Sequence, residues 1–388
     1  MKPNDHNPYL SFYGKNKISP VTQDLSNFSL HLLRREKLYR TLGIPIIAFE
    51  RKSILEVGCG GGYNTLAFLI WGAHMDLVEP NSKAREEIEP LFTKHGVDLN
   101  QWKLYDATIE TFNLQTGYDV VIAEGFLQCI PNKAQVVDKL SAAVKNGGVV
   151  VVTCADDISF FFELLKRIIG FRLIQIYNED RFTGQVELLS KAFASHLDSL
   201  QFASRPVNDW VIDNLVNPEP YGDFLSIADC IDLFNNEFEF LGSSPRMFTE
   251  YSWYKDVQSD QKCQVKERFY TNWHRLLMVG MPESVRSKGE NIRLKERIYA
   301  LRQCIEEHGN RIDERNHGAI LRHLEKVGDL AAGMDPRILK VIKEVSHLLC
   351  DDALTPEKVS NAEHFKTAFG CGQQYVSMVK NHTPNKQG

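Results

Sequence analysis

The sequence of 388 residues has little that would mark it as a secreted, metal-binding or nucleic-acid-binding protein. Its eight cysteines are scattered without a Cys-x-x-Cys pair, so we expect neither a disulfide framework nor a metal site. A formal net charge of −5 does not provide the basic surface that holds a nucleic-acid backbone, and we therefore expect no DNA binding.

Long apolar runs are also missing. The most apolar segment, residues 158–176, contains Glu163, Lys166 and Arg167, and these charges argue against a membrane span. The first residues lack the apolar stretch of a signal peptide. The expectation is a soluble, cytoplasmic protein.

Short apolar runs alternate with helical stretches over residues 52–155. This alternation predicts parallel strands joined by helices, and the continuous apolar run at residues 149–153 is typical of a strand covered on both faces. Two later apolar runs, at residues 238–244 and 274–282, supply the remaining strands. The fold class that we predict is therefore α/β, with a doubly wound, mostly parallel seven-stranded sheet.

The rest of the chain is divided around this core. Residues 156–224 follow a strand and are rich in aromatics, so we expect an inserted roof over the substrate. We expect the final segment, residues 369–381, to cap a helical tail with Tyr375, Val376 and Val379 as an apolar stripe, although it could also reach the active site. The predicted ranges are 1–51 for an N-terminal helical lid or cap, 52–282 for the core, and 283–388 for a helical C-terminal region that could mediate homo-oligomer formation.

The most specific motif is ILEVGCGGGYNT at residues 54–65, in which an acidic residue and glycines alternate after a strand. Glycine allows a tight turn and a close approach of the backbone to a ligand, which indicates a nucleotide-like cofactor. A dinucleotide fingerprint would need a glycine where Tyr63 stands, and a phosphate loop ending in Gly-Lys-Ser/Thr is absent. An NAD- or FAD-type domain remains the less favoured alternative.

This motif resembles the first motif of class I S-adenosylmethionine-dependent methyltransferases, and the resemblance extends over residues 52–155. It implies that Glu56 lies near the methionine end of the cofactor and that a glycine turn lies beneath it. It also implies that Glu79 binds both ribose hydroxyls and that Asp106 faces the adenine amino group. The cofactor-binding residues predicted in this way are Glu56, Gly58, Cys59, Gly60, Gly62, Glu79, Pro80, Asp106, Ala107 and Glu124. Taken singly, Glu79 and Asp106 could instead be solvated loop acids.

In the same family the residues after the fourth strand border the transferable methyl group. Enzymes that methylate planar nitrogens often carry Asn/Asp-Pro-Pro-aromatic there, whereas this chain has Ala-Glu-Gly-Phe at residues 123–126. The departure argues against an adenine or glutamine acceptor. Glu124 is the candidate catalytic group, with a contact to the cofactor or to a helix start as the alternative.

Residues for the acceptor come from two segments. Tyr13 belongs to an aromatic N-terminal segment that the resemblance makes a lid, and Trp210 and Asn214 belong to the roof, where an aromatic ring and an amide could hold a small molecule. His196 is a further candidate base or a packing residue. The predicted function is S-adenosylmethionine-dependent methyl transfer to oxygen or nitrogen of a small molecule, with S-adenosylhomocysteine as product. RNA or protein methylation and a non-catalytic regulator remain alternatives.

Overall fold

The structure, a computed structural model, describes residues 8–200, 203–218, 224–234, 236–247, 253–255 and 261–381. The chain divides into two compact units, each of which is described by itself. Unit 1 comprises residues 1–155, 221–266 and 373–388, and unit 2 comprises residues 156–220 and 267–372. Part of the predicted roof, residues 201–202 and 219–223, and residues 1–7 of the predicted lid lie outside the described residues. The domain ranges predicted above therefore stay predictions.

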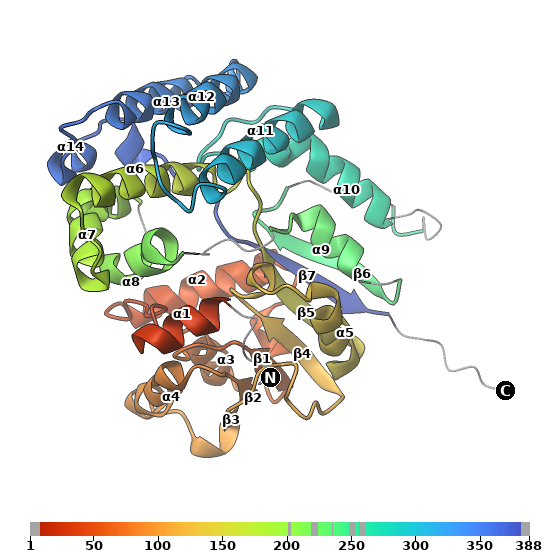
Figure 1. Cartoon of the computed structure of the whole chain (residues 1–388). Coiled ribbons are helices and arrows are strands. Elements are labelled where there is room, and N and C mark those ends of the chain that lie inside the picture. Colours follow the sequence, from red (N-terminus) through yellow and green to blue (C-terminus); the bar gives the residue numbers. More distant parts are fainter. Residues whose placement is uncertain are drawn as a thin grey trace. The chain divides into compact units, whose positions relative to one another are not determined.

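Unit 1 is built on a seven-stranded sheet in the order β3-β2-β1-β4-β5-β7-β6, as Figure 1 shows. Strands β1 to β5 pair in parallel, and β7 pairs antiparallel with both β5 and β6. This confirms the predicted fold class. The strands are β1 (Ser53–Val57), β2 (His74–Val78), β3 (Trp102–Tyr105), β4 (Tyr118–Ala123), β5 (Val144–Cys154), β6 (Phe238–Ser244) and β7 (Gln374–Lys380).

Helices connect the strands of unit 1 and cover the sheet. Because both faces are covered, residues 120–123 of the central β4 are all buried, which explains their continuous apolar sequence. An aromatic group of Tyr39, Phe49 and Phe68 belongs to the core packed around this sheet. The helices are α1 (Pro8–Asn16), α2 (Phe28–Thr41), α3 (Thr65–Ile70), α4 (Ser82–Lys94), α5 (Lys133–Ala143) and α9 (Ile227–Leu233), with short 3₁₀ turns η1 (Ile46–Ala48), η2 (Leu99–Gln101) and η3 (Leu127–Cys129).

The prediction for the last strand is wrong. Residues 274–282 do not form a strand, because the 3₁₀ turn η5 (Trp273–Leu276) follows α10 (Gln261–Asn272) directly and buries Leu276, Leu277 and Met278. The strand between β5 and β6 is β7, from the segment that we predicted to cap the helical tail. In β7, Val376, Ser377 and Met378 are all buried, so they are part of the sheet rather than an apolar stripe on a helix.

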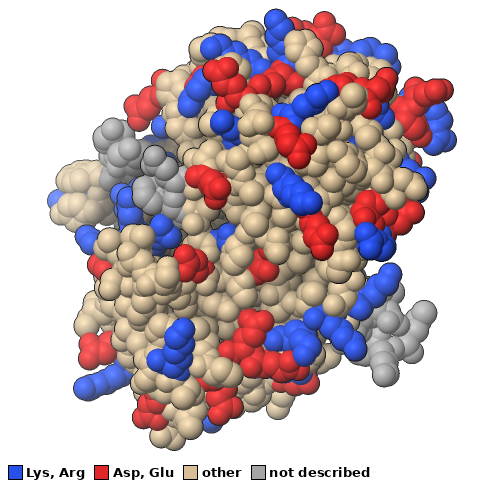
Figure 2. Space-filling model, turned by 90° about the vertical axis from the view of Figure 1, so that its left-hand side faces the viewer, with Lys and Arg blue, Asp and Glu red and all other residues tan. Residues whose placement is uncertain are grey.

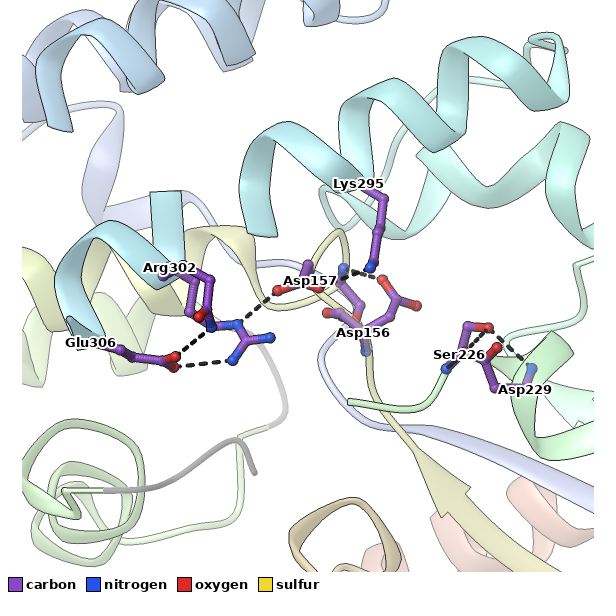
Figure 3. Close-up of polar contacts among 9 residues, drawn as sticks. Asp156, Asp157, Ser226, Asp229, Lys295, Arg302 and Glu306 are labelled. Carbon is purple, nitrogen blue, oxygen red and sulfur yellow. Dashed lines mark hydrogen bonds and ion pairs between the residues drawn. The ribbon is translucent and has the colours of Figure 1, made fainter. Parts of the chain in front are cut away.

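Unit 2 is helical, which confirms the predicted helical C-terminal region. Its longest helix, α11, sends Lys295 and Arg302 toward the buried carboxylate of Asp157 (Figure 3). The elements are α6 (Phe161–Tyr177), α7 (Phe182–Ser199), α8 (Val207–Val211), the π-turn η4 (Ile212–Val216), α11 (Lys288–Glu306), α12 (His317–Ala331), α13 (Pro336–Leu349), α14 (Pro356–Ser360) and η6 (Phe365–Thr367). Among the described helices of the chain, none is long and apolar enough to cross a membrane.

Candidate functional site

The glycine turn at residues 58–62 leaves the carboxyl end of β1, where the sheet order runs to β2 on one side and to β4 on the other. In an open α/β sheet this switch in strand order is where ligands bind. Gly58, Gly60 and Gly62 all have positive φ, at 71°, 56° and 78°. A Cβ at Gly62 would lie 2.8 Å from the Phe92 ring, so the turn needs glycine for its conformation and for its packing.

Glu79 follows β2 directly and reaches the turn. Its Oε2 accepts a hydrogen bond from the backbone N–H of Gly60 at 2.8 Å, and its Oε1 accepts one from the N–H of Asn81 at 2.8 Å. Burial raises the pKa of this carboxyl, and the two N–H bonds oppose the shift. Glu79 is therefore an ordered acceptor beside the turn and not a solvated loop acid.

Asp106 follows β3 and stays largely in solvent. Its Oδ2 accepts a 2.6 Å hydrogen bond from Arg85 Nη2, and its side chain is 71% exposed. Arg85 also donates to the carbonyl of Glu79 at 2.8 Å, so this arginine links the ends of β2 and β3. The predicted neighbours Pro80 and Ala107, next in sequence to Glu79 and Asp106, are half-buried.

Glu56 is buried in β1, two residues before the turn. Its Oε2 accepts a 2.7 Å hydrogen bond from Thr65 Oγ1 of α3. Burial, and then the charge of Glu124, raise the pKa of Glu56 to about 8. The neighbouring Cys59 thiol is buried as well, and burial raises its pKa well above the ordinary value. With this pKa, Glu56 is protonated at neutral pH and lies two residues before the glycine turn.

Glu124 follows β4 and has both carboxylate oxygens occupied. Arg35 donates to Oε1 at 2.6 Å and to Oε2 at 3.1 Å, Tyr39 donates its hydroxyl to Oε1 at 2.7 Å, and Asn64 donates to Oε2 at 3.2 Å. The Arg35 and Glu124 side chains are each only 7% exposed. The predicted site residue is thus the centre of a buried polar network.

The residues of α2 in this network were missed from the sequence. His31, Arg35 and Tyr39 are the buried residues of α2, and they lie four residues apart, on one face of the helix. His31 Nε2 lies 3.1 Å from the carbonyl oxygen of Tyr63 in the glycine turn. A stripe of polar residues at helical spacing is the signal that could have identified α2 as part of the site.

A short segment before α2 covers the turn. Val21 Cγ2 lies 2.9 Å from the position of a Cβ built on Gly60, and Asn81 Nδ2 donates a 3.0 Å hydrogen bond to the carbonyl oxygen of Ile18. Pro20, between them, is buried. Residues 18–21, which we call the N-terminal strap, therefore pack against both the glycine turn and the loop after β2.

These residues fit a cationic sulfur nucleoside. The turn presents backbone without Cβ atoms, and Glu79 and Asp106 end adjacent strands as carboxylate acceptors for hydroxyl and amino donors. The buried Glu79 carboxylate suits a ligand with positive charge. A dinucleotide would also place a ribose hydroxyl at Glu79, and the residue that disfavours this ligand is Tyr63, which stands where its fingerprint needs a third glycine.

The predicted acceptor residues do not all belong to this unit. Tyr13 lies in α1 of unit 1, half-buried, with its ring centroid 5.9 Å from that of Phe12. Trp210 lies in unit 2, where it is buried and packs near Phe193 and Phe369. Asn214 donates a 3.0 Å hydrogen bond to the Trp210 carbonyl.

His196, the other candidate from the roof, is also a residue of unit 2. It is buried, and its Nε2 lies 3.0 Å from the carbonyl oxygen of Val359. Burial, reinforced by Lys166, lowers its pKa to about 3, so it is uncharged at neutral pH. Within the described part of the chain, no group of three or more His, Cys, Asp and Glu side chains is arranged to hold a metal ion.

Comparisons with known proteins identify a family for this part of the chain. Residues 31–185 match the model of a family described as a methyltransferase domain. No curated protein matches the sequence.

Solved structures give partial matches. An S-adenosylmethionine-dependent methyltransferase from Mesorhizobium loti is 16% identical over 30% of this chain and 52% of its own, with a TM-score of 0.27. PKMT2 from Rickettsia typhi in complex with AdoHcy is 15% identical over 62% of this chain and 50% of its own, with a TM-score of 0.40. The N-methyltransferase NodS from Bradyrhizobium japonicum, in complex with S-adenosylhomocysteine, is 16% identical over 39% of this chain and 74% of its own, with a TM-score of 0.31.

The chain thus spans about half the length of the first two of these structures, and at such TM-scores the likeness says nothing about substrate. The family match is more informative, because it begins in α2 and runs through β5 and so includes every strand that carries the site. Residues 31–185, which carry the glycine turn, Glu79, Asp106 and Glu124, therefore match a methyltransferase domain, and S-adenosylmethionine is the cofactor that this match supports.

Proposed function

We propose that the protein transfers a methyl group to an oxygen or nitrogen nucleophile of a small molecule. The observation that carries the proposal is the glycine turn with the Glu79 carboxylate hydrogen-bonded to it, at the switch in strand order between β1 and β4. Glu79 would hold the ribose hydroxyls, Asp106 the adenine amino group and Glu56 the methionine end. Cys59, Pro80 and Ala107 would line the same cofactor.

The chemistry that bound S-adenosylmethionine supplies is an electrophilic methyl carbon on a sulfonium sulfur. The chain's own task is to hold a nucleophile in line with that carbon and to exclude water. The contacts of Glu124 favour a holding role for this residue, because both of its oxygens are already engaged by Arg35, Tyr39 and Asn64. Its catalytic role stays a prediction.

A small acceptor is supported by the charges. Figure 2 shows acidic and basic side chains interspersed over the face in view. Three basic residues of α11 form ion pairs. Lys288 pairs with Glu267 at 2.7 Å, Arg302 with Glu306 at 3.0 Å, and Lys295 with Asp157 at 4.0 Å. Cations neutralised in this way are poor phosphate ligands, which argues against RNA as the acceptor.

The N-terminal strap and α2 are proposed as the lid over the cofactor. The strap contacts Gly60 through Val21 and the loop after β2 through the Asn81–Ile18 hydrogen bond. A segment that packs on the turn would have to move aside, or lie over the ligand, when the cofactor binds.

Calorimetric binding of S-adenosylmethionine tests the proposal. We expect wild type to bind, and Glu79→Ala and Gly60→Arg to lose most of the affinity, because one removes the acceptor and the other fills the turn. Glu86→Ala is the matched control, since its side chain is 61% exposed on α4 and is paired only with Lys83. Equal binding by all four proteins would contradict the site.

Turnover needs a second experiment. Candidate small-molecule acceptors would be screened with methyl-labelled cofactor, and labelled product is expected from wild type and not from Gly60→Arg. Transfer of label to RNA or protein instead would overturn the acceptor class. Binding without transfer to any acceptor would favour a non-catalytic regulator.

A further inference from the structure

The Arg35–Glu124 pair places two opposite charges at the end of β4, next to the glycine turn. Each side chain is only 7% exposed, and the guanidinium meets the carboxylate through two hydrogen bonds of 2.6 and 3.1 Å. Phe126, two residues after Glu124, lies 3.0 Å from the position of a Cβ on Gly58. Besides burial, the Glu124 charge raises the pKa of Glu56, and the Arg35 charge opposes that shift. The pair therefore lies within electrostatic reach of the cofactor turn.

A buried ion pair is not the arrangement that stabilises the folded state most at this position. Desolvation of two charges generally cancels much of their attraction, so apolar residues of similar volume often stabilise a core as well or better. Here the arginine also lies 5.2 Å from the ring centroids of Tyr39 and Phe68. The arrangement points to a use of the charges beyond stability.

The role of the ion pair follows from the charges of the methyl donor and of its product. The methyl donor carries a sulfonium, and the product is a neutral thioether, so a carboxylate near the sulfur favours the donor. A carboxylate that stabilises a cation which loses its charge during the reaction stabilises the ground state more than the transition state, and this lowers kcat. Pairing with a guanidinium removes this effect while keeping the carboxylate as an acceptor for Tyr39 and Asn64.

We propose that Arg35, acting through Glu124, is a positioning residue that sets the relative affinity of the site for sulfonium donor and thioether product. It neutralises the Glu124 carboxylate and fixes its two oxygens toward Tyr39 and Asn64. The inference rests on the proposed function, because it assumes that the crevice between β1 and β4 binds the cofactor. Arg35 itself need not touch the reacting atoms.

The test is the ratio of the dissociation constant of S-adenosylhomocysteine to that of S-adenosylmethionine, both measured by calorimetry. Arg35→Met leaves Glu124 unscreened and should raise the ratio by about fivefold, whereas Glu124→Gln leaves the guanidinium unpaired and should lower it by about fivefold. The double variant Arg35→Met with Glu124→Gln should return to within about twofold of wild type, because its net charge there is again zero.

Opposite shifts distinguish this role from a structural one. A variant that only distorts the site would weaken both ligands alike and leave the ratio unchanged. Arg35→Lys keeps the charge and should keep the ratio, and Arg40→Met on the same helix, with a side chain 69% exposed, is the matched surface control. Should Arg35→Met fail to fold, the isosteric Glu124→Gln still tests the sign.

The outcomes separate the two proposals. Failure of wild type to bind either ligand would overturn the proposed function. Binding by wild type with an unchanged ratio in Arg35→Met and Glu124→Gln, or with shifts of the same sign, would overturn the role of Arg35 alone. A higher ratio together with a lower kcat in Arg35→Met supports it.

Discussion

Val21 lies directly against Gly60, with its Cγ2 atom 2.9 Å from the position that a Cβ at residue 60 would take. Gly60 belongs to the glycine turn, which is the proposed cofactor site, and Val21 belongs to a segment about forty residues earlier in the chain. The N-terminal strap therefore packs directly against this turn. The contact also gives the lid hypothesis a single side chain to test.

Val21→Ala should loosen this cover. The variant removes both methyl groups of Val21, of which Cγ2 contacts Gly60, and leaves the Asn81–Ile18 hydrogen bond in place. Loss of this one methyl contact should make S-adenosylmethionine dissociate about threefold faster. Stopped-flow displacement measures this rate. Val285→Ala, at a residue 79% exposed, is the control, and an unchanged rate in Val21→Ala would argue against the lid.

Glu56 should make stability fall with rising pH. Its pKa is raised from 4.5 to about 8 by burial and by Glu124, so between these pH values the folded state holds a proton that the unfolded state has released. The contribution of Glu56 is therefore fully present below about pH 4.5 and is lost as pH rises toward 8, by at most about 1.4 kcal/mol per pH unit.

Glu56→Gln cannot titrate and should remove this slope. Urea unfolding of the cofactor-free proteins at pH 5.5, 6.5 and 7.5 measures this slope. The free energy of unfolding of the variant should rise relative to that of wild type as the pH increases. Glu86→Gln, at an exposed position, should follow wild type. Parallel pH profiles for wild type and Glu56→Gln would mean that Glu56 is ionised throughout this range.

Asp157 should stabilise unit 2 more than an exposed ion pair does. Its carboxylate is 2% exposed and accepts a 2.8 Å hydrogen bond from Arg302, with Lys295 at 4.0 Å (Figure 3). Asp157→Ala leaves two cations without this partner, at a cost of about 3 kcal/mol, or about 6 °C in the midpoint of thermal unfolding.

The matched comparison is Asp352→Ala. Asp352 makes a contact of 2.6 Å to Arg172, shorter than that of Asp157 to Arg302, but its side chain is 96% exposed. Solvent screens such a pair, so we expect a change of about 1 °C or less. Calorimetric melting of the full chain measures both, and similar shifts in the two variants would show that the burial of Asp157 contributes nothing.

The sequence predicts those parts of the fold whose pattern lies in neighbouring residues, and it does not predict contacts between residues far apart in the chain. The glycine turn and Glu79 could be predicted as site residues because each directly follows a strand of the regular strand–helix alternation. The polar stripe of α2 was missed, because His31, Arg35 and Tyr39 become a site only through their contacts with Tyr63 and Glu124, which lie far along the chain. The helical spacing of the stripe can be read from the sequence, but the pairing of Arg35 with Glu124, 89 residues away, has no local signature.

The misplaced strand has a similar cause. β7 pairs Gln374 with Cys154, 220 residues away, so no periodicity near either residue reports the pairing. The sequence QYVSMVK does alternate, with Val376 and Met378 on one face and Tyr375 and Ser377 on the other. The apolar run at residues 274–282 was the stronger signal, but its buried apolar residues, Leu276, Leu277 and Met278, end or directly follow a 3₁₀ turn instead of forming a strand.

The position of β7 leads to the last prediction. Truncation after Gly372 should prevent unit 1 from folding, although it removes only the final 16 residues of 388. β7 pairs with β5 at six positions and with β6 on its other side, so its loss exposes the edge of β5 and detaches β6 from the sheet. It also removes the hydrogen bond from Ser377 Oγ to the Leu42 carbonyl at 2.7 Å, which ties the strand to the end of α2.

Truncation after Asn381 is the matched control, because it removes the final 7 residues and keeps all of β7. We expect it to retain the circular dichroism and thermal midpoint of wild type, while the truncated chain aggregates or shows no cooperative transition for unit 1. Cofactor binding should disappear with the truncation, since α2 and the glycine turn both depend on this sheet. A truncated chain that melts cooperatively and binds S-adenosylmethionine as wild type does would show that the sheet is complete without β7.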